Sequence, residues 1–547
     1  MATATPPGLT ITIDVTQQVQ TIHSFGASDA WSIQFVGQWP LSKREAIADL
    51  LFETNLDGNN DPEGAGLSAW RFNLGAGGSR QSNISDVWRR ADTFLNSSFT
   101  GYDWTRLPGQ RWFLQAAARR GVEKFTAFVN SPPINMTKNG KAFCDSSSGS
   151  TNLASGNDDD FAVYLATILE HFSTVEGIDF DYVSPINEPK WSWEGRQEGC
   201  RYDRPDIKWV VDALYIELQG QGISTLIETP ESGEIINLYR GTSYDYIDQF
   251  FKTSGAYYIG DKVANVSGHS YWTATSSEIV GKRQSLHNKL NQCPGLEYSM
   301  TEYCILEENG PGRDLGINPA LYIARVIHFD LTIASASSWD WWLGVSPYNY
   351  KDGLVYVDKN TSNGNYYESK MLWAMGNFSR FIRPGMKRID ITRSDGATPG
   401  NTVEDLMISS YYNEPNSIVA TVFVNWDNQT KLVELDYQNL PTGKAINYII
   451  PYVTSSSDDL TAYSALSVDD TVEIPSRSVV TLVGMHKIAV DFEPDGDVDA
   501  DDLRTIASQW LQTSALACDI APHPIDGIVN LLDFTIFAQH WLEDTIP

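Results

Sequence analysis

Long apolar runs and positive charge are what this sequence lacks most clearly. No stretch of 18 apolar residues occurs among its 547 residues, so we expect no membrane-spanning helix. Lys and Arg total 39 against 69 Asp and Glu, and the formal net charge of −30 argues against a protein that binds nucleic acid. The N-terminal residues lack the basic and apolar regions of a signal peptide, and we expect a secreted protein whose leader has been removed.

Cysteine and histidine are also scarce. None of the five cysteines lies in a CxxC pair, and the eight histidines include no HExxH or HxH pattern. These absences argue against a structural zinc site and against a metal-dependent hydrolase, so we expect no cofactor for catalysis. Cys144 and Cys200 lie in Gly- and Ser-rich segments, where they form either a disulfide or two buried thiols.

Aromatic residues are abundant instead, at 12% of the chain with 17 Trp and 25 Tyr. Aromatic faces stack well on the apolar C–H faces of sugar rings, so this enrichment favours a carbohydrate-binding cleft. Large buried cores would explain the same composition, and for any single Trp that is the simpler interpretation.

Short apolar segments alternate with amphipathic helical segments over residues 25–384. Strands are predicted at residues 67–74, 124–130, 180–185, 224–229, 263–271, 296–301 and 335–342. Helices are predicted at residues 43–52, 112–120, 160–172, 206–219 and 319–332. This alternation predicts an α/β fold, a (β/α)8 TIM barrel. A doubly wound open sheet is the alternative, but no Gly-rich phosphate-binding turn opens a helix.

Residues 385–487 follow a different pattern, with short β runs separated by turn signals. Such spacing is typical of a β-sandwich. Apolar and polar residues alternate over residues 9–24, as in a half-buried strand, and we expect residues 1–24 to join the sandwich.

The last residues, 488–547, form a third predicted unit. Acidic residues stand at positions 1, 3, 5, 9 and 12 of one loop, with a glycine at position 6: Asp491, Glu493, Asp495, Asp499 and Asp502, with Gly496. Hard oxygen ligands at this spacing predict a calcium site. The helical segment of residues 502–511 recurs at residues 533–542, and this repeat argues against a simple acidic linker.

Two carboxylates close two of the predicted barrel strands. Glu188 follows the strand at residues 180–185, and Glu302 follows the strand at residues 296–301. Because barrel enzymes carry their chemistry at the carboxyl ends of the strands, both side chains are expected in one site. Glycoside hydrolysis needs such a pair, one carboxyl as general acid and the other as nucleophile or base. Glu228 or Glu231, at an adjacent strand end, could replace one of them.

The other strand ends carry residues that we predict to bind substrate. Asn187 is expected to hydrogen-bond a sugar 2-OH, and Arg71 either holds Glu302 ionised or forms a structural ion pair. Three more residues either contact the substrate or nucleophile or serve as core residues: His269, Tyr271 and Tyr303. Four tryptophans are predicted sugar platforms, at least one of them a plain core residue: Trp31, Trp193, Trp339 and Trp342.

Four motifs together resemble glycoside hydrolase family 30: Asn187-Glu188-Pro189, Thr301-Glu302-Tyr303, Phe25-Gly26-Ala27-Ser28 and Ser131-Pro132-Pro133. The resemblance covers residues 9–487 and implies a (β/α)8 barrel with a side β-sandwich built from both ends of the catalytic region. It also implies retaining hydrolysis of β-glycosidic bonds, with Glu188 as acid/base and Glu302 as nucleophile. Retaining enzymes hold their two carboxyl groups about 5–5.5 Å apart.

Residues 191–202 resemble the branch of the family that includes endo-β-1,6-galactanases, which implies cleavage of β-1,6-galactan in arabinogalactan side chains. The same family leaves three alternatives, β-1,4-xylanase, β-1,6-glucanase and exo-β-glycosidase activity. Residues 341–350, expected as a loop, lack the Arg with which the family's glucuronoxylanases read an acidic side group. A non-catalytic carbohydrate-binding scaffold is the alternative outside the enzymes.

The C-terminal repeat resembles a type I dockerin. This resemblance implies bound Ca²⁺ and a cohesin-type protein as partner, in addition to the polysaccharide substrate. The second half of the repeat departs from the pattern, because residues 518–533 carry extra residues.

Overall fold

The structure, a computed structural model, describes residues 8–145, 150–241, 244–306, 312–442, 444–486, 490–492, 498–513, 517–521 and 527–541. Contacts within the chain divide it into two units. The first unit contains residues 22–58 and 62–380, and the second contains the N-terminal residues, residues 59–61 and everything from Phe381 onward.

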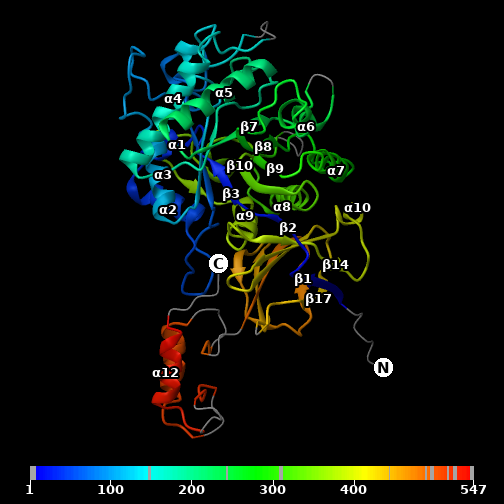
Figure 1. The fold of residues 1–547 in the computed structure, drawn as a ribbon. Helices are drawn as coiled ribbons and strands as arrows, with labels where there is room; N and C mark the ends of the chain where they lie inside the picture. Colours follow the sequence, from blue (N-terminus) through cyan, green and yellow to red (C-terminus); the bar gives the residue numbers. More distant parts are fainter. Residues whose placement is uncertain are drawn as a thin grey trace. The chain divides into compact units, whose positions relative to one another are not determined.

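The first unit is an eight-stranded parallel barrel surrounded by helices (Figure 1). Its strands pair in sequence order from β3 to β10, and β10 pairs with both β9 and β3, which closes the barrel. The barrel strands are β3 (Ser24–Ser28), β4 (Ala69–Asn73), β5 (Lys124–Phe128), β6 (Tyr182–Ser184), β7 (Leu226–Ser232), β8 (Val263–His269), β9 (Glu297–Glu302) and β10 (Ala336–Ser346). Nearly every residue of these strands is buried, as expected when side chains fill the barrel on one face and meet helices on the other.

The helices of this unit are α1 (Ile33–Val36), α2 (Leu41–Phe52), α3 (Pro108–Arg119), α4 (Asp158–His171), α5 (Arg204–Gln221), α6 (Ile236–Tyr239), α7 (Ile279–Leu290), α8 (Ile317–Thr332) and α9 (Lys370–Ser379). Helices α2, α3, α4, α5 and α8 agree with the predicted segments to within a few residues. The sequence did not predict α1, α6, α7 or α9. In α7 the buried stripe is narrow and includes a charged residue, Arg283.

Strand β10 is longer than predicted and overturns one expectation. The predicted strand ended at residue 342, but residues 343–346, expected in a loop, continue β10, which pairs in parallel with β11 (Gly353–Val357). Strand β11 in turn pairs with β12 (Tyr366–Tyr367). A bulge between Trp341 and Leu343 interrupts the pairing of β10 with β3.

The second unit contains a β-sandwich. One sheet has the order β14-β1-β17-β21, and the other has the order β19-β18-β22-β16-β15-β13-β2, with β20 paired to β18. The strands are β1 (Leu9–Asp14), β2 (Gln18–Thr21), β13 (Lys387–Ile389), β14 (Thr392–Arg393), β15 (Leu406–Asn413), β16 (Ile418–Asn425), β17 (Lys431–Gln438), β18 (Tyr448–Thr454), β19 (Asp459–Ala462), β20 (Leu466–Ser467), β21 (Val472–Ile474) and β22 (Ser478–Met485), with a short helix α10 (Pro399–Thr402). Side chains of both sheets share one core, for example Ile11 and Val433 with Phe423 and Val480.

Strands from both ends of the chain build this sandwich, since β1 pairs with β17 and β2 pairs with β13. The division between the units falls between Thr21 and Ile22 and between Arg380 and Phe381, a few residues before each expected boundary.

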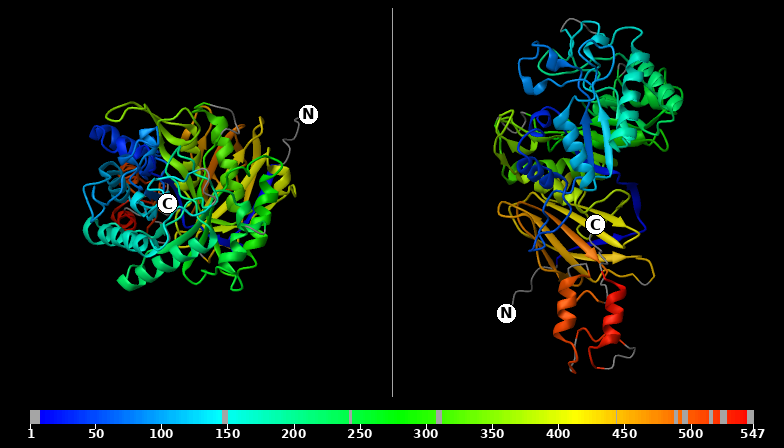
Figure 2. Two further views of the ribbon diagram at one scale, coloured as in Figure 1. Left: turned by 90° about the horizontal axis from the view of Figure 1, so that it is seen from above. Right: turned by 90° about the vertical axis from the view of Figure 1, so that its left-hand side faces the viewer.

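Helices α11 (Ala500–Ser508) and α12 (Leu531–Gln539) form the C-terminal part of the second unit (Figure 2, right, orange and red). A small hydrophobic core joins them through Ile506 and Phe537, together with Val498, Cys518 and Val529. Two of the predicted calcium ligands, Glu493 and Asp495, lie outside the described residues.

The disulfide considered between Cys144 and Cys200 is not formed. Both residues are buried free thiols, and a hydrogen bond from Cys200 lowers the pKa of Cys144 to about 7. No helix in the described part of the chain is long and apolar enough to cross a bilayer.

Candidate active site

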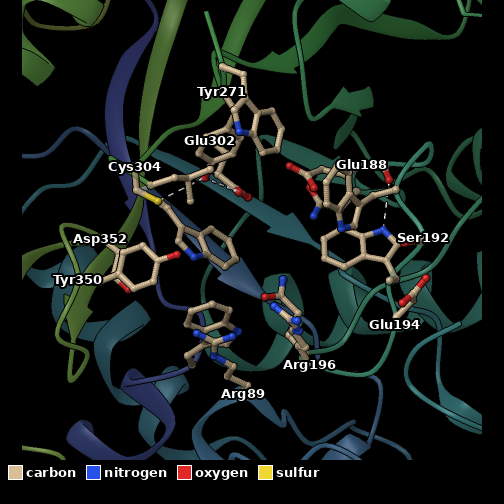
Figure 3. Close-up of a pocket in the computed structure, with 18 residues that line it drawn as sticks. Arg89, Glu188, Ser192, Glu194, Arg196, Tyr271, Glu302, Cys304, Tyr350 and Asp352 are labelled. Atoms are coloured by element: carbon tan, nitrogen blue, oxygen red, sulfur yellow. Dashed lines mark hydrogen bonds between the residues drawn. The ribbon is translucent and has the colours of Figure 1, made fainter. Parts of the chain in front are cut away.

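A cavity of about 500 Å³ opens at the carboxyl ends of the barrel strands (Figure 3). Five tryptophans and the two predicted catalytic glutamates line it. The lining residues are Trp31, Arg89, Asn187, Glu188, Trp191, Ser192, Trp193, Glu194, Arg196, Gln197, Tyr271, Trp272, Glu302, Cys304, Leu306, Trp342, Tyr350 and Asp352. A polar floor with aromatic walls suits a ligand that offers both hydroxyl groups and apolar ring faces.

Glu188 and Glu302 face each other across the cavity floor. Glu302 is the last residue of β9, and Glu188 stands on the turn after β6 with a positive φ of 41°. Carboxylate oxygens of both residues and a ring nitrogen of His269 all lie within 4.8 Å of one another. This upper limit agrees better with the carboxyl separation of about 5–5.5 Å in retaining glycosidases than with the about 6.5–9.5 Å of inverting ones.

His269, at the end of β8, joins Glu188 to a third carboxylate. Its Nδ1 lies 2.9 Å from Glu188 Oε1, and its Nε2 lies 3.0 Å from Glu231 Oε2. Glu231 also accepts a hydrogen bond of 3.0 Å from the Arg71 guanidinium. The side chains of His269, Glu231 and Arg71 are at most 1% exposed, so they support the cavity floor from behind.

The charges of this cluster shift the pKa values of its members. Burial opposes ionisation of His269, but the charge of Glu302 and the hydrogen bonds to Glu188 and Glu231 raise the pKa of His269 to about 10. Burial likewise opposes ionisation of Glu231, but Arg71 and His269 lower the pKa of Glu231 to about 2. Glu231 is therefore a permanent anion that balances Arg71, and it is a poor candidate for a proton donor.

Glu302 behaves differently from Glu231. Burial raises the pKa of Glu302 to about 7. The positive charges of His269 and Arg71 oppose this rise in pKa, and the negative charge of Glu188 adds to it. Arg71 is 3.9 Å from Glu302 Oε2, farther than its 3.0 Å contact with Glu231. Of the two roles predicted for Arg71, the shorter contact favours the structural ion pair with Glu231, while its charge also lowers the pKa of Glu302.

Tyr271 and Asn187 are two further polar residues of the cavity. The Tyr271 hydroxyl donates a hydrogen bond of 2.9 Å to Glu302 Oε1. Asn187 donates its amide to Asn130 Oδ1 at 3.0 Å, which leaves Asn187 Oδ1 buried and without a partner among the described residues. A buried acceptor of this kind is stabilised when a ligand hydroxyl donates to it.

Several predicted substrate residues do line the cavity, but others do not. Trp31, Trp193 and Trp342 are part of its wall, as are Asn187 and Tyr271. Trp339 is fully buried and donates to Asp330, and Tyr303 is 1% exposed and stacks on Tyr271. Their burial favours the core role that the sequence left open for both residues. The buried contacts of His269 and Arg71 behind the floor likewise favour the structural role that was the alternative for each.

An aromatic pair that was not predicted to bind substrate also lines the cavity. Trp191 and Trp272 stack with ring centroids 5.6 Å apart, and their residues are 48% and 40% exposed. Arg89 was missed as well, and its guanidinium lies 4.5 Å from the ring centroid of Trp31. Trp191 and Trp272 each follow a predicted strand end by a few residues, which was the available signal.

Glu228, considered as an alternative catalytic residue, is 3% exposed and is not among the described residues that line the cavity. Burial and the charge of Glu231 raise the pKa of Glu228 to about 8, so it is a neutral carboxylic acid at neutral pH. Neither Glu228 nor Glu231 fits the role of a catalytic partner as well as Glu302.

Glu188, His269 and Glu302 are close enough together to hold a metal ion. A histidine ligand must be neutral, however, and the raised pKa of His269 keeps its ring protonated and hydrogen-bonded to two carboxylates. The donor set therefore fits proton transfer better than metal binding.

Comparison with known proteins agrees with this geometry. The family model described as O-glycosyl hydrolase family 30 matches residues 8–356. The chain belongs to this family. It is therefore a glycoside hydrolase of family 30, built as a (β/α)8 barrel with an additional β-rich unit.

Relatives within family 30 differ in substrate. The chain is 26% identical to an endo-β-1,6-galactanase of Hypocrea rufa over 440 residues, which cover 76% of this chain and 81% of that protein. It is 21% identical to a glucuronoxylanase of Bacillus subtilis, with 68% and 77% coverage. Among solved structures, a conserved exported protein of Bacteroides fragilis is similar with a TM-score of 0.81 and 33% identity, over 87% of this chain and all of that one.

Proposed function

We propose that this family 30 member is a secreted, retaining endo-β-1,6-galactanase. The observation that supports it most is the Glu188–Glu302 pair, whose oxygens lie within 4.8 Å in a cavity walled by tryptophans. The similarity to an endo-β-1,6-galactanase over most of both chains favours galactan over xylan or glucan as substrate. The similarity to an exported protein favours secretion.

In the first step of this mechanism, Glu302 attacks the anomeric carbon while Glu188 donates a proton to the departing glycosidic oxygen. The C–O bond to the leaving group breaks as the bond between Glu302 and the sugar forms. Glu188, now ionised, then removes a proton from water, and the resulting hydroxide releases the sugar from Glu302 with retained configuration.

The surrounding residues assist both steps. Tyr271 holds Glu302 Oε1 through its hydroxyl, and the free Oδ1 of Asn187 is available to the sugar 2-OH, a contact that strengthens in the transition state. Burial raises the pKa of Glu302 to about 7 and so favours a proton on it. The positive charge that develops on the sugar stabilises ionised Glu302, so the proton of the pair belongs on Glu188 when the bond breaks.

A hydrolysis screen of the purified chain on β-1,6-galactan, xylan and β-1,6-glucan tests this proposal. Release of short galacto-oligosaccharides is expected, and Glu188→Gln and Glu302→Gln should each lower the rate by about a thousandfold or more. Glu228→Gln is the matched control, because it replaces one neutral buried group by another outside the cavity. Turnover of xylan or glucan alone would keep the mechanism and reject galactan, whereas turnover that survives either of the first two substitutions would reject the catalytic pair.

We also propose that the C-terminal helices belong to a calcium-binding, dockerin-like module with a cohesin-type partner. Each helix begins with a capping box, Asp499 with Asp502 in α11 and Asn530 with Asp533 in α12. Asp502 accepts backbone N–H groups of Phe492 and Asp499, and Asp533 accepts those of Ile520 and Ala521. The two halves thus use the same local arrangement, as a duplicated loop and helix would.

The residues present fit a calcium ion. Asp491, Asp502 and Asp533 are fully buried, and Asp519 is 7% exposed with a buried Oδ1 that has no partner in the described part of the chain. Buried carboxylates require a cation or hydrogen-bond donors. Asp491, Asp499 and Asp502, with Glu493 and Asp495, would hold the ion of the first loop, and the ion would supply the charge that lets these carboxylates remain ionised.

A further inference from the structure

A second, smaller hollow of about 250 Å³ opens beside Glu188. Its described lining is Glu188, Lys190, Trp191, Ser192, Gly233, Glu234, Asn237 and Trp272. Four of these residues, Glu188, Trp191, Ser192 and Trp272, also line the main cavity, so the two spaces meet at the acid/base. Its volume is below the range of about 300–1000 Å³ for drug-sized ligands, which suits a single sugar residue.

The two spaces differ in which catalytic group they touch. The main cavity is lined by Glu188, Glu302, Asn187 and Tyr271, whereas none of the last three is among the described residues of the smaller hollow. In double displacement the nucleophile contacts the ring that is attacked, and the acid contacts the oxygen of the departing group. A space that touches the acid but not the nucleophile therefore lies on the leaving-group side of the bond.

The absence of a side chain at Gly233 keeps the acid open to the smaller hollow. A Cβ atom at this position would lie 2.9 Å from both Cδ and Oε1 of Glu188, closer than real side chains approach. The carboxyl group of Glu188 is held by its contact of 2.9 Å with His269 Nδ1, so moving it aside would break this contact. The chain at Gly233 thus leaves a path from the Glu188 carboxyl group into the hollow.

The stacked tryptophans Trp191 and Trp272 form the wall that the two spaces share. Their rings are nearly parallel, at an interplanar angle of 14°, and Trp272 has a left-handed φ of 54°. Such a backbone conformation is costly for a bulky residue and persists where the surroundings or a function require it. Trp31 and Trp193, which also line the site, share this conformation, with φ of 64° and 52°.

Polar groups line the hollow together with the tryptophans. Lys190 donates a hydrogen bond of 3.3 Å to Asn237 Oδ1, and its ammonium group lies 4.5 Å from the ring centroid of Tyr244. Glu234 adds a carboxylate acceptor to the lining. Aromatic faces together with donors and acceptors match the two kinds of surface of a hexose ring.

We propose that this smaller hollow is a leaving-group subsite, in which the first sugar residue of the departing chain stacks on the Trp191–Trp272 pair and hydrogen-bonds to Lys190, Glu234 and Asn237. The proposal rests on the proposed hydrolysis by Glu188 and Glu302. When the glycosidic bond breaks, the oxygen of the sugar in this subsite receives the Glu188 proton, and the sugar leaves through the hollow. A filled subsite on this side favours cleavage within a chain, because the site then binds sugar on both sides of the bond.

The test compares two substrates that share the glycone but differ in the leaving group. One is a galacto-oligosaccharide, and the other is a glycosyl fluoride, whose leaving group is a single atom that cannot stack on a ring. For Trp272→Ala and Trp191→Ala we expect the ratio of kcat/KM on the oligosaccharide to kcat/KM on the glycosyl fluoride to fall by about tenfold, since a stacking contact is lost on one substrate only. Trp272→Phe, which keeps a smaller ring, should give an intermediate ratio.

Two controls define the outcome. Trp342→Ala removes a wall residue that lines only the main cavity and should lower both rates together with the ratio unchanged. Trp209→Ala removes an exposed tryptophan of α5 that lines neither space and should change neither rate. An unchanged ratio in Trp272→Ala and Trp191→Ala, with an active parent enzyme, would overturn the subsite alone. A parent chain that hydrolyses neither substrate would overturn the proposed function and, with it, the subsite.

Discussion

At the residue scale, the active site balances three carboxylates against two cations. Arg71 and protonated His269 offset two of the negative charges of Glu188, Glu231 and Glu302. Glu231 keeps its charge because both cations contact it, so the remaining charge falls on the Glu188–Glu302 pair. Like charges this close cannot both ionise easily, and the pair retains one proton near neutral pH.

This charge balance predicts the alkaline limb of the pH profile. The pKa of Glu302 in the folded, substrate-free enzyme is raised to about 7, so the pair holds its proton below this pH and loses it above. Bond cleavage needs that proton on Glu188, and we therefore expect kcat/KM to fall about tenfold per pH unit well above pH 7. Initial rates at low substrate concentration between pH 4 and pH 9 measure this, and a profile that stays flat through about pH 9 would contradict it.

The separate roles of the two glutamates predict opposite stereochemistry in chemical rescue. In Glu188→Ala, azide should attack the sugar bound to Glu302 and give a glycosyl azide of retained configuration. In Glu302→Ala, azide should replace the missing nucleophile directly and give the inverted product. Nuclear magnetic resonance of the products from an activated aryl glycoside distinguishes them. Retained product from both variants would mean that Glu302 is not the nucleophile.

At the element scale, the close packing of strands β3 and β10 depends on Gly26. A Cβ atom at Gly26 would lie 2.3 Å from Asp340 Oδ1 and 2.8 Å from the Ala69 Cβ of β4. All three positions belong to paired strands of the closed barrel, so the neighbouring backbones cannot separate without loss of pairing. The close packing of these strands therefore explains why the Phe25-Gly26-Ala27-Ser28 motif has glycine at its second position.

Gly26→Ala is expected to destabilise the barrel by about 1–3 kcal/mol, the usual cost of overpacking a core. Thermal unfolding followed by circular dichroism should give a lower Tm than the parent chain. Gly281→Ala in α7 is the matched control, because a Cβ atom there has open space within 4 Å and Ala favours a helix. Equal Tm values for the two variants would contradict the packing argument.

At the scale of the whole molecule, the proposed calcium module predicts a metal dependence unrelated to hydrolysis. Calcium at about 100 times its Kd should stabilise the C-terminal residues by about 2.7 kcal/mol, so a chelator should lower their unfolding temperature. In calorimetric titration of the full chain, Asp491→Asn should weaken calcium binding at least about tenfold.

Asp501→Asn is the control for this titration, since Asp501 is exposed, pairs with Arg504 and stands outside the predicted ligand pattern. It should bind calcium as the parent chain does. The absence of any heat of binding to the parent chain would refute the calcium site, whereas the hydrolysis screen would be unaffected.

The fold was largely predictable because its signals are local. Apolar strands that end in polar residues, and amphipathic helices between them, recur along residues 25–384, and the structure confirms the barrel that this pattern predicted. Helix α7 and the long β10 were not predictable to the same degree. The apolar stripe of α7 is too narrow to predict a helix. Strand β10 continues through residues whose sequence predicted a loop.

The candidate site was predictable only in part. Glu188 and Glu302 stand out in the sequence, because each is a carboxylate that ends a strand. Trp339 and Trp342 look alike, yet one is core and the other lines the cavity. Residues three positions apart on a strand face opposite sides, so the spacing separates the two rings, but it does not tell which side meets the cavity.

The sequence by itself determined the barrel, the family and the pair of carboxylates, since these follow from periodicity and from short motifs. Only the tertiary structure decided which cation serves which carboxylate and which aromatic rings face the substrate. Arg71, Glu231 and His269 come from β4, β7 and β8, and Trp191 and Trp272 come from separate loops. Their contacts are set by distances of about 3 to 6 Å across the closed barrel, and strand closure brings together groups that the linear chain keeps far apart.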